Sequence, residues 1–443
     1  MNLLSNLMFC VICYPLFFFA DLFTFGINVN RIFLSALFFF INTVFLFSQD
    51  LNYCRKTLDT LCSPYMEGRG YVNSGDLKAA NFIANEFLKL HLKPVLPSSG
   101  NSKVDSFSSF LQPFPISVNT FPGKIKLSLN DSVLTPGKDF LVSSSSPSVT
   151  GEFPVVANLE NPHSTKNSFL IITKEYWKKE SKNLLAKKGY AGILVQTGKI
   201  PWDVSGETDE FPVIFLFGEV TIPENARISV EIENKYYKKY TAHNIIGLVT
   251  GNSKKDSLIV VTAHYDHLGR MGSDTYFPGA NDNASGVTLL LCLADYFSKK
   301  KELLSYSMLF ICFSGEEAGL VGSTYFTENS PIDLNKIRLL INIDLVGYGQ
   351  EGMMIQNAPS YPKEFAQMDS INNVNKFLVT LKKRGNAPNS DHYPFTMKGV
   401  PAFFIYTLGG NKAYHDVFDK PENISLEYFS GVFNLMRIFI ERL

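Results

Sequence analysis

The 443-residue chain carries 41 basic and 41 acidic side chains, so its formal net charge at pH 7 is zero, and 45% of its residues are hydrophobic. This balance excludes a strongly basic surface for nucleic acid and an acidic disordered tail, so no nucleic-acid partner is expected. The length is enough for one large domain and a smaller one, each with its own core.

Residues 1–48 form a hydrophobic leader in which Asp21 and Arg31 are the only charged side chains. A basic residue, an apolar run and a polar start are typical of a secretory signal, here with cleavage near Gln49. A retained membrane anchor is the alternative, because the run 32–48 approaches spanning length. Both interpretations place the remaining chain outside the cytoplasm, secreted or periplasmic, with membrane contact only through an uncleaved leader.

After the leader, helices are predicted at 51–61 and 76–90, the second because its apolar residues recur at helical spacing. They belong to residues 49–110, the N-terminal part of the main domain. Between residues 111 and 235, short β-rich runs alternate with loops rich in Ser, Pro, Asn and Gly. This change of texture predicts a smaller β-rich α/β module inserted into the main domain.

Four cysteines follow the leader. Cys54 and Cys62 are a candidate disulfide pair in an oxidising compartment, whereas Cys292 and Cys312 lie in apolar segments and are expected to be buried. No CxxC motif occurs after the leader, so a thiolate zinc site is not expected.

In the last part of the chain, residues 236–443, apolar strands alternate with helices. Strands are predicted at 257–263, 307–313, 337–343 and 401–407, and helices at 285–298, 318–327, 363–381 and 426–443. Buried strands that alternate with helices predict an α/β fold, a three-layer sandwich with a mixed, largely parallel central sheet.

Polar side chains follow the ends of these strands, where ligands bind in sheets of this kind. Taken singly, each has an ordinary explanation, such as a hydrogen-bonded histidine or an aspartate that caps a helix. Together they bring two histidines, two aspartates and two glutamates to one edge of the sheet: His264, Asp282, Glu316, Glu317, Asp344 and His415. So many carboxylates are unfavourable in one place unless cations neutralise them.

Imidazole and carboxylate ligands together suit zinc, with manganese and cobalt as alternatives. Asp282, Glu317 and Asp344 bring three negative charges, which exceed the charge of one Zn²⁺ ion. The charge count therefore favours two zinc ions per chain, provided that the ligands converge.

Six motifs in this part resemble, in the same order, those of the co-catalytic two-zinc aminopeptidases. That family also takes in glutamate carboxypeptidases and is related to glutaminyl cyclases. The motifs lie between residues 245 and 423: His264-Tyr265-Asp266, Gly279 to Gly286, Gly315 to Ser323, Asn342-Ile343-Asp344, Ser390 to Phe395 and Tyr414-His415. More weakly, residues 111–235 resemble the protease-associated domain of some members, and a lineage-specific β decoration is the alternative.

The resemblance implies a role for seven residues: His264 and Asp344 as ligands of one zinc ion, Glu317 and His415 as ligands of the other, Asp282 as the bridge, Glu316 as the general base and Tyr414 at the oxyanion. It also implies a cis peptide bond after Asp282. Around this centre, Asp266 is expected to orient His264, and Asp391 to orient the site by hydrogen bonds. Asp419 is expected to support the His415 loop, and the role of His267 stays open.

By this resemblance the chain is expected to be a metallo-aminopeptidase acting on peptide substrates. A carboxypeptidase or dipeptidase on the same centre is the first alternative. Glutaminyl cyclase, an acyltransferase with one zinc, is less favoured because Tyr414 replaces its usual Trp, and Trp177 and Trp202 lie far from the motifs in sequence. A non-catalytic receptor ectodomain is less favoured because no ligand is missing.

Overall fold

The computed structural model describes residues 50–443 except 98–106, 131, 158–166, 180–188, 219–222, 224 and 411. The predicted leader and its cleavage site therefore lie outside the described residues. Contacts join Asp50–Leu443 into one unit. Across the described ranges, no helix is both long and apolar enough to cross a membrane.

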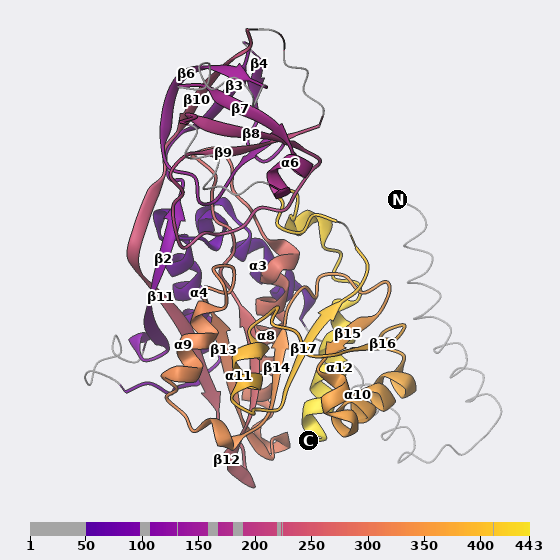
Figure 1. The fold of residues 1–443 in the computed structure, drawn as a ribbon. Coiled ribbons are helices and arrows are strands. Elements are labelled where there is room, and N and C mark those ends of the chain that lie inside the picture. Colours follow the sequence, from indigo (N-terminus) through magenta and orange to yellow (C-terminus); the bar gives the residue numbers. More distant parts are fainter. Residues whose placement is uncertain are drawn as a thin grey trace, which may run out of the picture. The chain divides into compact units, whose positions relative to one another are not determined.

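A nine-stranded mixed sheet forms the centre of the larger part of this unit (Figure 1). Its order is β1-β11-β13-β12-β14-β17-β15-β16, with β2 paired to β11. The strands are β1 (Lys93–Pro94), β2 (Leu111–Thr120), β11 (Lys235–Val249), β12 (Lys254–His264), β13 (Tyr306–Phe313), β14 (Ile337–Ile343), β15 (Met353–Gln356), β16 (Leu381–Arg384) and β17 (Ala402–Thr407). The central strands β13, β12, β14 and β17 are parallel to one another, whereas β11 and β15 join them antiparallel.

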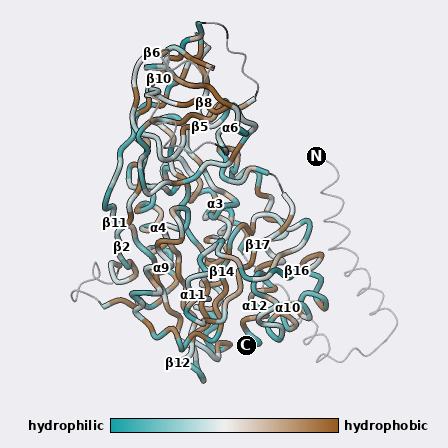
Figure 2. The backbone as a smooth tube through the Cα atoms, viewed as in Figure 1, coloured by the Kyte–Doolittle hydropathy of each residue, from teal (hydrophilic) through white to brown (hydrophobic). Residues whose placement is uncertain are grey.

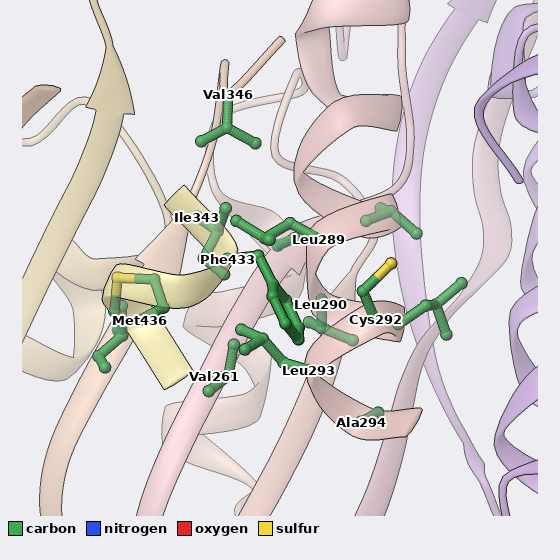
Figure 3. Packing of buried hydrophobic residues seen from close by; sticks show 14 of the residues in the cluster. Val261, Leu289, Leu290, Cys292, Leu293, Ala294, Ile343, Val346, Phe433 and Met436 are labelled. Carbon is green, nitrogen blue, oxygen red and sulfur yellow. The ribbon is translucent and has the colours of Figure 1, made fainter. Parts of the chain in front are cut away.

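Helices cover both faces of this sheet. One face carries α3 (Leu51–Leu61), α4 (Gly75–Lys89), α8 (Ser285–Lys299), α10 (Pro362–Asn375) and α12 (Phe429–Glu441), and the other carries α9 (Val321–Glu328) and α11 (His392–Met397). Figure 3 shows Leu290 and Leu293 of α8 packed with Val261 of β12 and Phe433 of α12. The α/β three-layer prediction is confirmed.

One predicted helix ends early. The pattern over 363–381 predicted a single helix, but α10 ends at Asn375 because Lys376 adopts a left-handed conformation with φ of 56°. The Asn372 side chain then accepts a hydrogen bond from the Leu378 backbone N–H at 2.9 Å and holds the turn. The residues that follow form the edge strand β16.

A second sheet of eight strands has the order β4-β3-β10-β6-β7-β8-β9-β5. Its strands are β3 (Ile125–Leu129), β4 (Ser132–Leu134), β5 (Phe140–Val142), β6 (Val149–Val156), β7 (Phe169–Thr173), β8 (Gly192–Thr197), β9 (Val213–Phe217) and β10 (Arg227–Ile232). Figure 2 shows that hydrophobic residues run along β8, as they do along β14 of the large sheet. We propose that residues 111–235 form an inserted module. Its two ends lie in β2 and β11, which pair with each other.

The cysteine contacts differ from the pair considered from the sequence. Cys54 of α3 and Cys292 of α8 are both buried, with their sulfur atoms 2.9 Å apart. Cys62 is buried elsewhere in the same core. The candidate Cys54–Cys62 disulfide is therefore wrong for this fold, because α3 presents Cys54 to α8 rather than to its own C-terminal end.

Candidate metal centre

The predicted ligands converge at one edge of the large sheet. His264 is the last residue of β12, Asp344 directly follows β14, and Glu317 follows β13 by a few residues. These three strands are parallel neighbours, so their carboxyl ends meet. Asp282 lies in η5 (Ala280–Ala284) just before α8, and His415 lies in the loop after β17.

The five side chains form two groups that share Asp282. His264 Nε2 lies 3.3 Å from Asp282 Oδ1 and 3.4 Å from Asp344 Oδ1. His415 Nε2 lies 3.1 Å from Asp282 Oδ2 and 3.1 Å from Glu317 Oε2. Each oxygen of the Asp282 carboxylate thus faces a different histidine, which is the arrangement a bridging ligand requires.

These separations suit zinc. Ligand atoms about 2.0–2.1 Å from a tetrahedral zinc ion lie about 3.3 Å from one another. His264 Nε2 and Asp344 Oδ1 are buried and, within the described part of the chain, have no hydrogen-bond partner. Burial lowers the pKa of His415, but Glu317 and Asp282 outweigh it and raise that pKa to about 11. Negative charge from these carboxylates therefore stabilises a positive charge at this position.

A second layer of side chains holds Glu317 and its neighbour. His267 Nδ1 lies 2.7 Å from Glu317 Oε1, the oxygen that does not face His415. The Asp266 carboxylate accepts hydrogen bonds from the backbone N–H groups of Glu316 and Glu317, at 3.2 and 3.4 Å. His264 Nδ1 meets the Asp266 backbone oxygen at 3.2 Å and its carboxylate at 3.8 Å. Asp266 therefore orients the Glu316–Glu317 pair as well as His264.

The loop that carries Asp282 is fixed from two sides. The Asp419 carboxylate accepts hydrogen bonds from the backbone N–H groups of Asn281 and Asp282, at 2.9 and 3.0 Å. Asp419 lies in the loop that carries His415, and its backbone N–H donates to the Asp416 oxygen at 3.1 Å, so it ties that loop to the bridging loop. The peptide bond between Asp282 and Asn283 is cis, as expected.

Arg69 is a supporting residue that the sequence did not single out. It is fully buried, and its guanidinium donates hydrogen bonds to the backbone oxygens of Tyr265, Pro278 and Gly279 at 2.6 to 2.8 Å. It also lies 3.2 Å from the backbone oxygen of Asp282. In the sequence, the one feature that sets this arginine apart is its place between two glycines in a loop before α4.

The loop between β8 and β9 of the second sheet reaches the predicted ligands through Trp202. His415 Nδ1 lies 2.7 Å from the backbone oxygen of Trp202, whose N–H donates back to the His415 backbone oxygen at 3.2 Å. The Trp202 ring stacks on Phe277, with centroids 4.7 Å apart. Trp202 lies far from the motifs in sequence, yet the fold brings it to a ligand. A contact through a backbone carbonyl leaves no signature in the residue types.

Glu316 and Tyr414 face a pocket of about 250 Å³ beside the ligands. Glu316 lies with His264 and Asp344 so that one ligand-type atom of each is within 4.8 Å of the others. Burial raises the pKa of Glu316 well above that of an ordinary carboxyl group. The Tyr414 ring stacks over His415 at 3.9 Å. In the Ser390–Asp391 motif, it is Ser390 that contacts a proposed ligand: its Oγ donates a hydrogen bond to Asp344 Oδ2 at 3.4 Å.

Comparison with known proteins agrees with this architecture. Residues 244–440 match the model of Peptidase family M28. Aminopeptidase YwaD of Bacillus subtilis (strain 168) is 28% identical over 234 residues, 51% of this chain and 50% of that protein. A probable leucine aminopeptidase of Arthroderma otae is 30% identical over 197 residues, 42% of this chain and 54% of that protein. The chain spans about half the length of these curated relatives.

Solved structures show the same fold over most of the chain. The zinc aminopeptidase BSAP from Bacillus subtilis superposes with a TM-score of 0.65 at 20% identity, covering 88% of this chain and 94% of that one. An aminopeptidase from Aneurinibacillus sp. strain AM-1 gives a TM-score of 0.59 at 19% identity, covering 89% and 94%. Residues 244–440 are thus similar to peptidase family M28, and the solved structures show that the fold of the chain is that of these aminopeptidase structures.

Proposed function

We propose that this protein is a zinc-dependent aminopeptidase that hydrolyses N-terminal residues from peptides. The observation that carries the proposal is the Asp282 carboxylate, which presents one oxygen to His264 and the other to His415. Two zinc ions per chain would be held as follows: one by His264 and Asp344, the other by Glu317 and His415, with Asp282 shared. Zinc bound there would lower the pKa of a water molecule and polarise the scissile carbonyl.

Glu316 is the proposed general base. It lies beside the ligands and faces the pocket, and burial raises its pKa, which makes its carboxylate a stronger base. It would take a proton from the attacking water and pass it to the departing amine as the C–N bond breaks. Because burial also raises the pKa of Tyr414, its hydroxyl stays protonated and can donate a hydrogen bond to the oxyanion.

The substrate panel that tests this proposal compares aminoacyl, N-blocked and C-terminal peptide substrates, each with and without a chelator. We expect cleavage of substrates with a free amino terminus, loss of cleavage with chelator, and recovery when zinc is added back. Cleavage of only N-blocked or C-terminal substrates would instead assign a carboxypeptidase or dipeptidase. Cyclisation of N-terminal glutamine without hydrolysis would assign the acyltransferase alternative.

We also propose that the protein is exported by its hydrophobic leader. The support is the sequence pattern of Arg31 followed by the apolar run 32–48. N-terminal sequencing of the protein from the culture medium or periplasm tests this. A mature chain that begins near Gln49 is expected, and a chain that still begins at Met1 would contradict cleavage.

A further inference from the structure

The pocket beside the metal centre has two chemically different ends. One end is formed by residues of the centre itself: His264, Asp282, Glu316 and Asp344. The remaining wall consists of three aromatic rings, two further uncharged side chains and a single arginine: Phe404, Tyr406, Tyr414, Leu345, Asn389 and Arg384. Among the described residues, Arg384 is therefore the one cationic side chain of the wall beyond the predicted ligands.

The fold aims Arg384 at this pocket. Arg384 ends β16 and lies in one row with Gln356 of β15 and Phe404 of β17. Successive side chains of a strand point to opposite faces. Lys383 extends over the Phe365 ring of α10, with Nζ 4.5 Å from its centroid. Arg384 consequently points to the opposite face, where its Nη1 donates to the Tyr406 hydroxyl at 2.9 Å.

The wall that carries Arg384 is tied to the metal centre by hydrogen bonds. Gln356 Nε2 donates to the Ala387 backbone oxygen at 3.0 Å and to Asn389 Oδ1 at 2.6 Å. Asn342 Nδ2 donates to Ser390 Oγ at 2.8 Å. Since Ser390 in turn meets Asp344, the loop after β16 has a fixed position relative to the ligands.

The guanidinium of Arg384 has donors to spare. It carries five N–H donors, and one of them is engaged by Tyr406. Within the described part of the chain, no carboxylate forms a salt bridge with it; Arg338 of β14, by contrast, pairs with Glu364 at 2.8 Å. An apolar substrate group in the pocket would remove water from the guanidinium without replacing its hydrogen bonds, which is unfavourable. A carboxylate would accept two parallel hydrogen bonds from it.

We propose that this pocket binds a carboxylate of the substrate through Arg384, so that the enzyme prefers substrates with a carboxylate close to the scissile bond. This inference rests on the proposed peptidase function. The carboxylate has two sources: the side chain of an N-terminal Asp or Glu, or the free C-terminus of a dipeptide. Among the described residues that line the pocket outside the ligand cluster, Arg384 is the side chain that would attract this carboxylate.

Two kinetic comparisons distinguish these sources. The first measures kcat/KM for Glu- and Asp-p-nitroanilide against Leu- and Lys-p-nitroanilide. The second measures kcat/KM for Ala-Ala against Ala-Ala amide. Each is made with the zinc-loaded wild-type protein, with Arg384→Gln and with the control Lys382→Gln, which changes an exposed lysine of the same strand that does not line the pocket.

We expect the wild type to prefer one carboxylate-bearing set, and Arg384→Gln to lower kcat/KM for that set at least tenfold, mainly through KM, with less than a twofold change on Leu-p-nitroanilide. A loss on the Glu and Asp substrates identifies the N-terminal side chain as the source; a loss confined to Ala-Ala identifies the C-terminus. Lys382→Gln should match the wild type in both comparisons.

Binding gives a readout separate from turnover. In the Glu316→Gln background, L-glutamate should bind more tightly than L-norleucine if the side chain is the source, and Ala-Ala should bind more tightly than Ala-Ala amide if the C-terminus is. Adding Arg384→Gln should remove the difference in either case. The inference would be overturned if the wild type showed no preference in either comparison, or if Arg384→Gln lost activity equally on the carboxylate-bearing and the carboxylate-free substrates of both comparisons. Failure to cleave any substrate of the panel would instead overturn the proposed peptidase function.

Discussion

His415 Nδ1 lies 2.7 Å from the backbone oxygen of Trp202, a residue 213 positions earlier in the chain. Histidine ligands generally need such an acceptor to fix the ring and its tautomer. Here the acceptor comes from the proposed inserted module, whose core also takes in Leu268, Phe277 and Val417 of the catalytic part. The proposed module thereby contacts one of the proposed zinc ligands directly.

This contact predicts that Trp202→Ala weakens zinc binding. The substitution keeps the backbone carbonyl but removes the indole that anchors it by stacking on Phe277 and by donating to the Val142 oxygen at 2.7 Å. We expect zinc affinity to fall by about 10- to 100-fold, the range found for outer partners of metal ligands. Competition with a chromophoric chelator measures it.

Trp177→Ala is the matched control, because Trp177 packs on Phe215 inside the module. Its zinc affinity should equal that of the wild type. Equal affinities for Trp202→Ala and the wild type would show that the module does not position His415.

Glu316→Gln tests the proposed base. The amide cannot accept the proton, so kcat should fall by about 10²- to 10⁴-fold. Zinc content should not change, because the proposed ligands are all retained. Elemental analysis and steady-state kinetics measure the two quantities. The exposed Glu302, changed to Gln, is the control and should keep full activity. A near-normal kcat for Glu316→Gln would remove Glu316 from the mechanism.

Asp76 gives a prediction about pH and stability. Burial raises the pKa of this carboxyl from 3.8 to about 7, although Tyr240 donates a hydrogen bond to it. Because the pKa is higher in the folded state, ionisation favours unfolding, and this group lowers the free energy of unfolding as pH rises from about 4 to about 7. Asp76→Asn should stabilise the protein at pH 8, by on the order of 3 kcal/mol, and have little effect at pH 4.

Chemical denaturation at both pH values measures this difference. Exposed Asp256, changed to Asn, is the control and should show no such pH dependence. If Asp76→Asn has the same effect at pH 4 and pH 8, the Asp76 carboxyl does not titrate in this range.

The sequence could predict that the proposed ligands converge because several of them sit at strand ends. His264 and Asp344 follow apolar strands whose parallel pairing can be inferred from the strand–helix alternation. Arg384 could not be found this way, because the pattern over 363–381 continues a helix that Lys376 in fact ends. Its strand β16 is short and polar, and it pairs only at the edge of the sheet.

Contacts that involve backbone atoms could not be predicted from the sequence for a different reason. Trp202 acts through its backbone oxygen, and any residue type has that atom. Arg69 and Asp419 bind backbone groups of the Asp282 loop across long sequence separations. A pattern of residue types predicts which side chains meet a metal more readily than it predicts what holds their loops.

The measurement that tests the central claim most directly is the zinc content per chain. It is determined by elemental analysis of the purified protein, with Asp282→Ala in parallel. The bridging geometry of Asp282 between His264 and His415 predicts two zinc ions in the wild type and loss of zinc from both positions in the variant. One zinc ion per wild-type chain, or two retained by Asp282→Ala, would contradict it.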